Sequence, residues 1–227
     1  MQKLPGGKIP LAGRAPLAKG GYRRIYQHPY FENLLIKVIS MATLEHYERR
    51  SAWYKGLRRS RGYHYVFREI DEYLALRLRN KHELPFLQKF NGIVDTDLGL
   101  GVVVEKVKAR NGKLAPSVTS LVREKGLSPD LRKKLLRLRD DVIRHHVIFT
   151  DVSGNNIVVA RGERGRDRLV IIDGLGDRLW LPVNVLSARV NRLNRIRHFD
   201  RAIAKLERID RERRARAKSR VKPAKSR

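Results

Sequence analysis

Two polar residues, Asp151 and Asn156, have the types and spacing that phosphoryl transfer requires. Asp151 lies five residues before Asn156, and the apolar run Ile157–Ala160 follows immediately. In phosphoryl-transfer enzymes with this spacing, the aspartate reaches the acceptor hydroxyl and the asparagine holds a metal ion on the phosphates. Asp151 is therefore the candidate catalytic residue and Asn156 a candidate metal ligand. The short pattern alone more often marks a turn than a site.

A third polar residue, Asp173, follows the next apolar run. Leu169–Ile172 and Ile157–Ala160 flank the charged turn Arg161–Arg168, and this pattern predicts a β-hairpin. Antiparallel pairing would bring Asp173 beside Asn156. Carboxylate and amide oxygens suit a Mg²⁺ ion that bridges phosphate oxygens. The sequence therefore predicts a Mg²⁺ site at Asn156 and Asp173, and the alternative is an ordinary hairpin with polar ends.

A lysine within an apolar run is the next candidate. Lys37 lies in Leu34–Ile39, where it needs either an anionic partner or an outward orientation. As a nucleotide-binding residue it would contact the α- and β-phosphates of ATP and pair with a carboxylate from the next helix. Glu69 is the favoured partner and Glu72 the alternative. The competing interpretation of Lys37 is a solvated edge residue.

Four further positions complete the candidate ATP-binding set. Gly20 and Gly21 would let backbone amides approach the phosphates, with one of the following arginines adding charge. Glu105 and Val107, at the end of a later strand, are the other two candidates. A lone Gly-Gly pair is weak evidence without the lysine that follows it.

Strand and helix patterns supply the elements that must position these residues in the N-terminal half. The chain from Leu17 to Ile39 predicts two short strands joined by a turn around Pro29, and Phe86–Val107 predicts a hairpin with its turn at Asp95–Gly99. A helix between them ends before Pro85. Its apolar face is expected at Phe67, Ile70, Leu74 and Leu78.

The C-terminal half contains the best-marked helix. Ser128 is a typical N-cap and Pro129 a typical first helical residue. His145 and His146 end this helix and are interpreted as capping or packing residues. A last helix is expected from Val183 to about Leu206. The buried stripe of the first helix is expected at Leu131, Leu135, Leu138 and Val142.

This order of elements predicts an α+β, protein-kinase-like bilobal fold with a minimal, truncated C-terminal lobe. Residues 1–107 form a β-rich nucleotide-binding lobe with one main helix. Residues 108–206 form a small, mostly helical lobe that carries the catalytic loop, and residues 207–227 form a basic, disordered tail.

Composition narrows the functional classes. The chain has 227 residues, 41% of them hydrophobic, and no cysteine, which excludes disulfides, thiol catalysis and cysteine-ligated metals. No apolar run approaches the length of a membrane span, and the N-terminus lacks the apolar core of a signal peptide, so we expect a cytoplasmic protein. The formal net charge of +28 favours contact with polyanions, including nucleic acid, through the basic tail.

Five segments in this order resemble the PhoP regulatory network protein YrbL family. That family is placed in the protein-kinase-like superfamily, near the sugar and lipopolysaccharide-core kinases, and the resemblance implies a kinase-like nucleotide site. It covers about residues 17 to 180. The segments are residues 20–29, 35–38, 94–105, 151–159 and 169–177.

Several positions depart from the pattern of protein kinases. Phe149 and Thr150 replace the His and Arg of the His-Arg-Asp motif, Ser153 replaces a phosphate-contacting lysine, and Leu175 replaces the Phe of Asp-Phe-Gly. Only 54 residues follow Asp173 in this sequence, so we expect neither a full activation segment nor a full substrate-binding lobe.

Three functional hypotheses follow from these features. The first is an ATP- and Mg²⁺-dependent phosphotransferase acting on an unidentified small-molecule or protein acceptor. The second is a pseudokinase that binds ATP and regulates without transferring phosphate. The third is a basic nucleic-acid-binding protein, although no recognition helix, zinc finger or aromatic RNA-binding motif is present.

Overall fold

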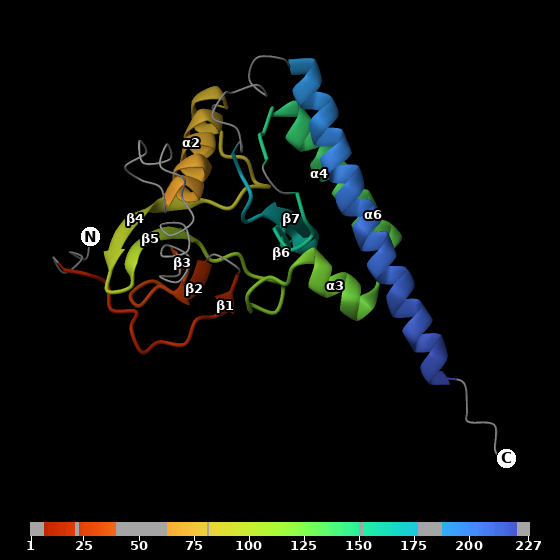
Figure 1. Cartoon of the computed structure of the whole chain (residues 1–227), viewed down its shortest axis with the longest axis horizontal. Helices are drawn as coiled ribbons and strands as arrows, with labels where there is room; N and C mark the ends of the chain where they lie inside the picture. The colour runs from red at the N-terminus through yellow and green to blue at the C-terminus, as the bar shows by residue number, and fades with distance from the viewer. Residues whose placement is uncertain are drawn as a thin grey trace, which may run out of the picture. The chain divides into compact units, whose positions relative to one another are not determined.

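The computed structural model contains two compact units, whose elements are drawn in Figure 1. The first unit comprises Met1–Asp71 and Gln88–Lys106, and the second comprises Glu72–Leu87 and Val107–Arg227. The first unit thus ends one residue before the lobe boundary expected at 107, whereas residues 72–87 belong to the second unit rather than the first. The stretches that the structure describes are residues 7–20, 23–39, 63–80, 82–149, 152–176 and 188–221.

The first unit is built on a five-stranded antiparallel sheet with the strand order β1-β2-β3-β5-β4. The two hairpins predicted from the sequence, β2–β3 and β4–β5, are both confirmed. The turn of the second hairpin is tighter than expected, because β4 continues to Thr96 and β5 begins at Gly99. The strands are β1 (Ala18–Lys19), β2 (Arg23–Gln27), β3 (Leu34–Ile39), β4 (Phe90–Thr96) and β5 (Gly99–Glu105).

Alternation along the central strand β3 gives each face of the sheet its own core. Ile36 and Val38 pack on one face with Leu11 and Tyr26 from the N-terminal segment and β2. The other face carries Leu35 and Ile39, which share a cluster with Val66 of helix α2 (His64–Arg79). Because successive side chains of a strand point to opposite faces, Lys37 lies on the same face as Leu35 and Ile39.

The helix α2 is present, but three of the four residues of its predicted buried face are exposed, and only Ile70 packs against the cluster of Leu35 and Ile39. Phe67, Leu74 and Leu78 are 47%, 51% and 89% exposed, whereas Val66 and Leu76 are buried. Apolar residues occur at helical spacing on two sides of this helix, so periodicity alone does not select the packed side. Tertiary contacts select the side that includes Glu72, a charged residue that is only 7% exposed.

In the part of the second unit that the structure describes, three helices beyond α2 pack with a two-stranded sheet. The helices are α3 (Val118–Lys125), α4 (Pro129–Arg144) and α6 (Ala188–Val221), and the strands are β6 (Ile157–Arg161) and β7 (Asp167–Ile171), with a short 3₁₀ turn, η3 (Glu163–Gly165), between them. Both α3 and α4 contact α6, which runs beside them in Figure 1. The apolar core includes Val118, Leu135, Val147, Ile171 and Phe199.

Helix α4 confirms its sequence signals in detail. The Ser128 Oγ accepts a hydrogen bond of 3.1 Å from the Leu131 amide, and Pro129 is the first helical residue. His145 is the C-cap, and its ring packs on Phe86 and lies 2.8 Å from the Asn80 side-chain oxygen, as expected for a capping and packing residue. The whole expected stripe, Leu131, Leu135, Leu138 and Val142, is buried.

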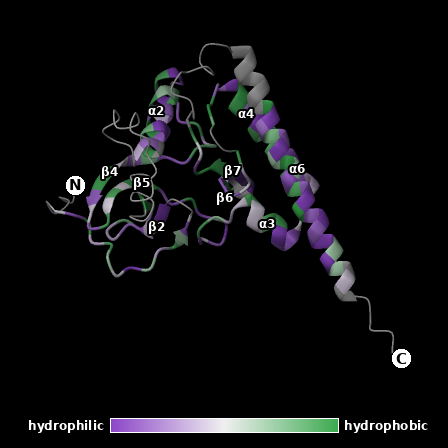
Figure 2. Cartoon of the chain, in the orientation of Figure 1, coloured by the Kyte–Doolittle hydropathy of each residue, from purple (hydrophilic) through white to green (hydrophobic). Residues whose placement is uncertain are grey.

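Helix α6 continues to Val221, well beyond the expected end near Leu206. Ile203 and Leu206 are buried, as the periodicity predicts, Phe199 is buried as well, and the contact face extends to Ile209 and Asp210. Asp210 is 6% exposed and its carboxylate contacts the guanidinium groups of the residues three and four positions on. Figure 2 colours much of this helix hydrophilic, which is why an apolar pattern does not reveal its full length. None of the helices within the described stretches is both long and apolar enough to cross a membrane.

Candidate functional site

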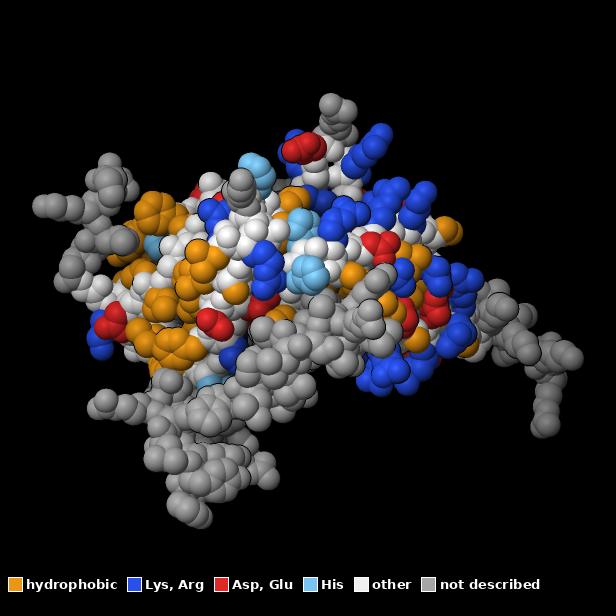
Figure 3. Space-filling view, turned by 90° about the horizontal axis from the view of Figure 1, so that it is seen from above, with side chains coloured by type: hydrophobic (Ala, Val, Ile, Leu, Met, Phe, Trp, Pro, Cys, Tyr) orange, Lys and Arg blue, Asp and Glu red, His pale blue; other side chains and the backbone are white. Residues whose placement is uncertain are grey.

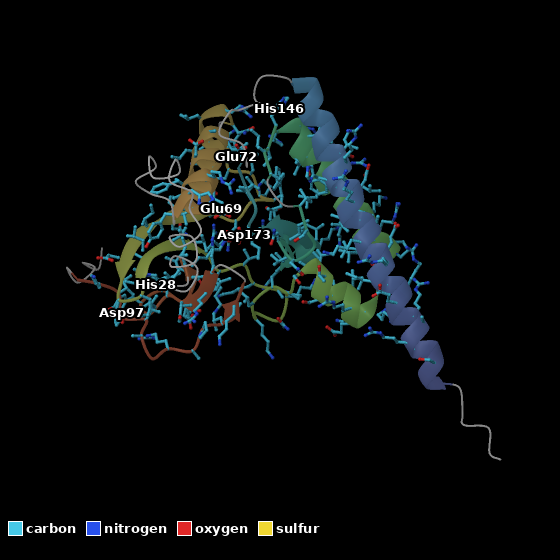
Figure 4. All side chains as sticks on the ribbon, viewed as in Figure 1. His28, Glu69, Glu72, Asp97, His146 and Asp173 are labelled. Carbon is cyan, nitrogen blue, oxygen red and sulfur yellow. The ribbon has the colours of Figure 1, made fainter. Side chains whose placement is uncertain are left out.

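The β6–β7 hairpin brings the two candidate metal ligands to one end of a small sheet. Ile157 pairs with Ile171, and the Ile172 amide donates a 2.9 Å hydrogen bond to the Asn156 carbonyl. Asn156 immediately precedes β6, and Asp173 follows the end of β7, so the two residues lie at the same end of the hairpin. This confirms the predicted hairpin, and Figure 4 labels Asp173 beside the strands.

Local hydrogen bonds orient both ligands. The Asn156 amide donates to the Ser153 carbonyl at 3.0 Å, which closes the turn before β6. The Asp173 Oδ1 accepts a 2.8 Å hydrogen bond from the amide of Gly174, whose φ of 89° suits a residue without a Cβ. The carboxylate is thus held against the backbone immediately after the hairpin.

One amide oxygen and one carboxylate match the hard-oxygen preference of Mg²⁺. Among the residues that the structure describes, no group of three or more His, Cys, Asp or Glu side chains could hold a metal ion. A Mg²⁺ ion on Asn156 and Asp173 would therefore take most of its remaining ligands from phosphate oxygens and water, as is usual for this ion in phosphotransferases. The donor set fits a metal that is carried in with a nucleotide.

The segment that leads into the candidate catalytic loop is fixed on both sides. The Ile148 amide donates 2.9 Å to Oε1 of Glu72, and the Ile148 carbonyl accepts 2.9 Å from the Gly176 amide. Next to it, Phe149 and Leu175 form an isolated antiparallel bridge. The chain before the catalytic loop and the chain after Asp173 therefore run side by side.

Glu72 is a positioning residue that sequence reasoning considered only as a partner for Lys37. Its buried carboxylate, labelled in Figure 4, accepts a hydrogen bond from the main chain three residues before Asp151. A buried carboxylate requires such a donor, because burial without one is costly. The signal in the sequence was its helical spacing from Leu76, which places Glu72 on the packed side of α2.

Gly154, within the candidate loop, is held against two helices. Its carbonyl accepts a 3.0 Å hydrogen bond from the Thr119 amide at the start of α3. A Cβ at this position would lie 2.7 Å from the Thr119 Oγ1 and 2.9 Å from Cδ2 of Leu206 in α6. Space rather than a left-handed backbone requires glycine here, since no positive φ occurs at Gly154. The loop is thus seated on α3 and α6.

Asp151, the candidate catalytic residue, lies outside the described residues, as does its neighbour Thr150. The described residues on either side are Phe149 and Val152, and both pack against the apolar core of the second unit. The Phe149 ring also lies 6.3 Å from that of Phe199 in α6, in an edge-to-face arrangement. The position at which protein kinases carry a histidine is therefore an apolar packing position in this chain.

Lys37 belongs to the first unit and is buried at 6% exposure, in the middle of the sheet. Its strand lies between β2 and β5, which excludes a solvated edge position. The α2 face on which it lies also carries an apolar cluster that includes Leu35, Ile39 and Val66. An ammonium group there requires compensation by negative charge.

Glu69, the predicted lysine partner, forms an ion pair with Arg23 in the first unit. The Arg23 Nη1 and the Glu69 Oε2 lie 2.5 Å apart, and the two side chains are 10% and 16% exposed. Arg23 pairs with Ile39 across the sheet and so shares the face of Lys37. Sequence reasoning offered the arginines after Gly21 only as phosphate contacts. Figure 4 shows Glu69 on α2, one turn before Glu72.

The structure describes two of the next three candidates for nucleotide contact, Gly20 and Glu105. Gly20 donates its amide to the Arg23 carbonyl at 2.8 Å, and a Cβ there would meet nothing closer than 3.5 Å, so Gly20 is not required by space. Gly21 lies outside the described residues. Glu105 donates its amide to the Lys89 carbonyl and accepts from the Gln88 side chain at 2.7 Å.

Val107, the last candidate for nucleotide contact, is 4% exposed and lies in the second unit. Its carbonyl accepts a 3.0 Å hydrogen bond from the Ala115 amide. Any contact with a nucleotide at Val107 therefore falls to its amide or to the second lone pair of this carbonyl.

Known proteins with similar sequences align with most of this chain. Two curated proteins named YrbL, from Escherichia coli (strain K12) and Shigella flexneri, are each 24% identical over 182 residues, which cover 79% of this chain and 79% of each relative. Among solved structures, the crystal structure of Rad53 1-466 in complex with AMP-PNP aligns with a TM-score of 0.47 and 14% identity. That alignment covers 71% of this chain and 38% of the Rad53 chain. Residues 9–207 match the sequence family described as PhoP regulatory network protein YrbL. The chain belongs to the PhoP regulatory network protein YrbL family.

Proposed function

We propose that this protein is an ATP-dependent phosphotransferase that uses Mg²⁺. The observation that carries the proposal is the β6–β7 hairpin, which presents Asn156 and Asp173 at one end of two hydrogen-bonded strands. The donor types suit Mg²⁺ on phosphate oxygens, and the loop between Asp151 and Asn156 has the length that phosphoryl-transfer enzymes use.

Each residue has a defined role in this proposal. Asp151 orients the acceptor hydroxyl and takes its proton as the acceptor oxygen bonds to the γ-phosphorus, while the bond from that phosphorus to the β,γ-bridging oxygen breaks and ADP leaves. Asn156 and Asp173 would hold Mg²⁺, which would neutralise charge on the phosphates. Lys37 contacts the α- and β-phosphates, and its buried setting strengthens that electrostatic contact. Glu69 orients the basic side chains on its face of the sheet.

The positions of Glu72 and Gly154 support the same proposal. Both hold main-chain segments next to the candidate loop, through the Ile148 amide and through Thr119 of α3. Catalysis by positioned charges requires groups that are fixed before the substrate binds. A loop that is fixed by a buried carboxylate and two helices satisfies that requirement.

The metal role of Asp173 can be tested by nucleotide binding. Titration calorimetry with ATP and Mg²⁺ should give saturable binding to the natural protein, and Asp173→Asn should weaken it at least tenfold, because the substitution removes the charged metal ligand. Asp140→Asn is the matched control, since Asp140 is exposed on α4 and its loss changes the net charge equally. Equal affinities of the natural and Asp173→Asn proteins for Mg-ATP would refute the assignment.

Transfer itself needs a second measurement. With γ-labelled ATP, label should reach an acceptor or water in the natural protein and disappear with Asp151→Asn, whereas ATP binding should persist. Binding without turnover would instead identify a pseudokinase. That alternative is favoured by the apolar packing of Phe149 at the position where protein kinases carry a histidine.

A further inference from the structure

The second unit contains a pocket that the proposed phosphotransfer does not use. Its volume is about 580 Å³, enough for a small organic molecule. The walls come from α4, from the charged turn between β6 and β7, and from short segments around Phe86 and Arg110. The charged residues that line it are Arg110, Asp130, Lys134, Arg137, Asp141, Arg166, Asp167 and Arg168.

Cations outnumber carboxylates in this lining, and most of the carboxylates are already paired. Asp167 lies 2.6 Å from the Arg110 Nε, and Asp130 lies 2.7 Å from the Lys134 Nζ. The third carboxylate, Asp141, lies 3.5 Å from Arg144 on the same helix. The pocket therefore keeps an excess of positive charge after its internal ion pairs are formed.

Three arginines supply that excess, and they differ in how their guanidinium groups are engaged. Among the described residues, no carboxylate lies within ion-pair distance of Arg137 or Arg166, although both side chains line the pocket. Arg168 differs from them, because its guanidinium group donates to the main-chain carbonyl of Pro85. Arg137 and Arg166 are thus the cations available to a ligand.

The pKa of Asp130 reflects the same excess of positive charge. The hydrogen bond from Lys134 lowers the pKa of Asp130, desolvation opposes this shift, and the positive charges of Lys134, Arg137 and Lys133 lower the pKa further. An anion at this end of α4 is therefore stabilised by its surroundings. A phosphate group placed nearby would meet the same field.

The backbone holds Arg166 in place. The turn before it is closed by hydrogen bonds from the Gly162 amide to the Arg166 carbonyl, at 2.8 Å, and from the Arg166 amide to the Glu163 carbonyl, at 3.1 Å. A Cβ on Gly162 would lie 2.4 Å from that same Arg166 carbonyl oxygen, so the turn is as tight as glycine allows. Arg137 is fixed by its place on α4, a helix with a hydrogen-bonded N-cap.

Apolar residues form part of the same pocket. Phe86, Leu138 and Leu169 line it beside the arginines, and Pro85 adds a further apolar surface. Arginine binds phosphate through paired N–H donors in a planar fork. An apolar wall with arginines at its rim suits a molecule that joins a phosphate to a carbon framework.

This pocket lies at the opposite end of the hairpin from the candidate metal site. Arg161 pairs with Asp167 at the pocket end, and Ile157 pairs with Ile171 at the other end. Four residue steps of β-strand separate the two ends by about 13 Å. We propose that the pocket is a second anion site, which binds a small organic phosphate through Arg137 and Arg166 and is separate from the site for Mg-ATP.

Titration calorimetry with inorganic pyrophosphate tests this assignment. The buffer contains EDTA and 150 mM NaCl, so that neither a metal ion nor general charge attraction dominates. The natural protein should bind one pyrophosphate, and the double variant Arg137→Gln with Arg166→Gln should bind at least tenfold more weakly. Because both side chains are exposed, the variant should keep the melting temperature of the natural protein.

Two controls separate this site from net charge and from the nucleotide site. Arg197→Gln with Arg201→Gln removes the same charge from the exposed face of α6 and should change the affinity less than twofold. Asp173→Asn should also leave pyrophosphate binding within twofold. An equal loss in both arginine double variants, no saturable binding by the natural protein, or a loss with Asp173→Asn would each overturn the proposal.

A phosphate group can also belong to a larger molecule. In the same assay, a 5′-phosphorylated oligonucleotide should bind no more tightly than its unphosphorylated form. The affinities of both oligonucleotides are also measured for the two arginine double variants. If Arg137→Gln with Arg166→Gln weakens only oligonucleotide binding and leaves pyrophosphate unaffected, the pocket does not bind small phosphates and the proposal is wrong.

Discussion

At Gly154, one missing side chain lets the candidate loop contact two helices at once. An added Cβ would lie within 3 Å of both Thr119 and Leu206, and neither neighbour is exposed. The neighbouring Asn156 depends on this seating, because it lies only two residues further along the loop. Glycine at position 154 is thus required by packing rather than by the conformation of its backbone.

Replacement of Gly154 by Ala should therefore destabilise the protein. We expect the free energy of unfolding to fall by about 1–3 kcal/mol, the usual cost of overpacking a tight contact. Chemical denaturation followed by circular dichroism measures the change. Gly7→Ala is the control, since a Cβ there meets nothing within 4 Å. Unaltered stability of Gly154→Ala would show that the loop is not seated on α3 and α6 in solution.

Around Lys37, the residue types alone predicted some of the interacting side chains but not all of them. The sequence identified Lys37 as a lysine in an apolar strand and Glu69 as a nearby carboxylate, and both are largely buried. It did not identify Arg23 as a partner of Glu69, because that pair joins residues 46 positions apart. The Arg23–Glu69 pair forms because the register of β2 against β3 places Arg23 on the α2 face of the sheet.

At the scale of elements, α2 is the case in which local pattern and packing disagree. Its length and position follow from the sequence, but its packed side does not. Leu76 is 2% exposed and belongs to the core of the second unit, whereas Leu78 is 89% exposed. Both leucines are equally good helix formers, so only the contacts distinguish them.

Paired alanine substitutions in α2 test this assignment. Leu76→Ala should lower the free energy of unfolding by about 2–5 kcal/mol, because it removes buried methyl groups and leaves a cavity. Leu78→Ala should change it by less than about 0.5 kcal/mol, since an exposed side chain leaves no cavity. Urea denaturation of both variants measures the difference. Comparable losses in the two variants would place the packed side of α2 where the periodicity predicts it.

Helix α6 shows the opposite limitation. Its apolar residues predict contact up to Leu206, but a polar contact extends the packed face by one more turn. Asp210 is buried against Gly126, where a Cβ would lie 2.7 Å from the carboxylate. Burial opposes ionisation of Asp210, but hydrogen bonds from Arg214 and Arg213 outweigh it and lower the pKa of the carboxyl. Ion pairs of this kind leave no apolar pattern in the sequence.

For the whole molecule, the net charge of +28 is the dominant property. Figure 3 shows Lys and Arg side chains gathered in patches, with Asp and Glu side chains scattered among them. Like charges at this density repel each other in the compact state. Individual surface ion pairs such as Arg132 with Glu207, at 3.1 Å, contribute little against that repulsion.

Salt should therefore stabilise the folded protein. Between 50 and 300 mM NaCl, screening shortens the range of repulsion and the melting temperature should rise by a few degrees. Differential scanning fluorimetry without nucleotide measures the change, and an equal osmolality of an uncharged sugar serves as the control. A melting temperature that falls with NaCl would mean that attractive ion pairs outweigh the repulsion.

The sequence by itself determined the local and the global features of this protein. It predicted the three hairpins, the N-cap of Ser128 and the stripe of α4, because these depend on residues close together in the chain. It also predicted the family, through the order of its motifs. The net charge needs no structure at all.

Only the tertiary structure decided which side chains meet across long distances in the chain. The contact of Glu72 with Ile148, the seating of Gly154 on Leu206 and the pocket between α4 and the β6–β7 turn all join distant segments. Each depends on how packed elements are rotated and aligned. Helical periodicity leaves that rotation open when two sides of a helix are apolar, and charged residues that pack through hydrogen bonds leave no hydrophobic pattern to predict it.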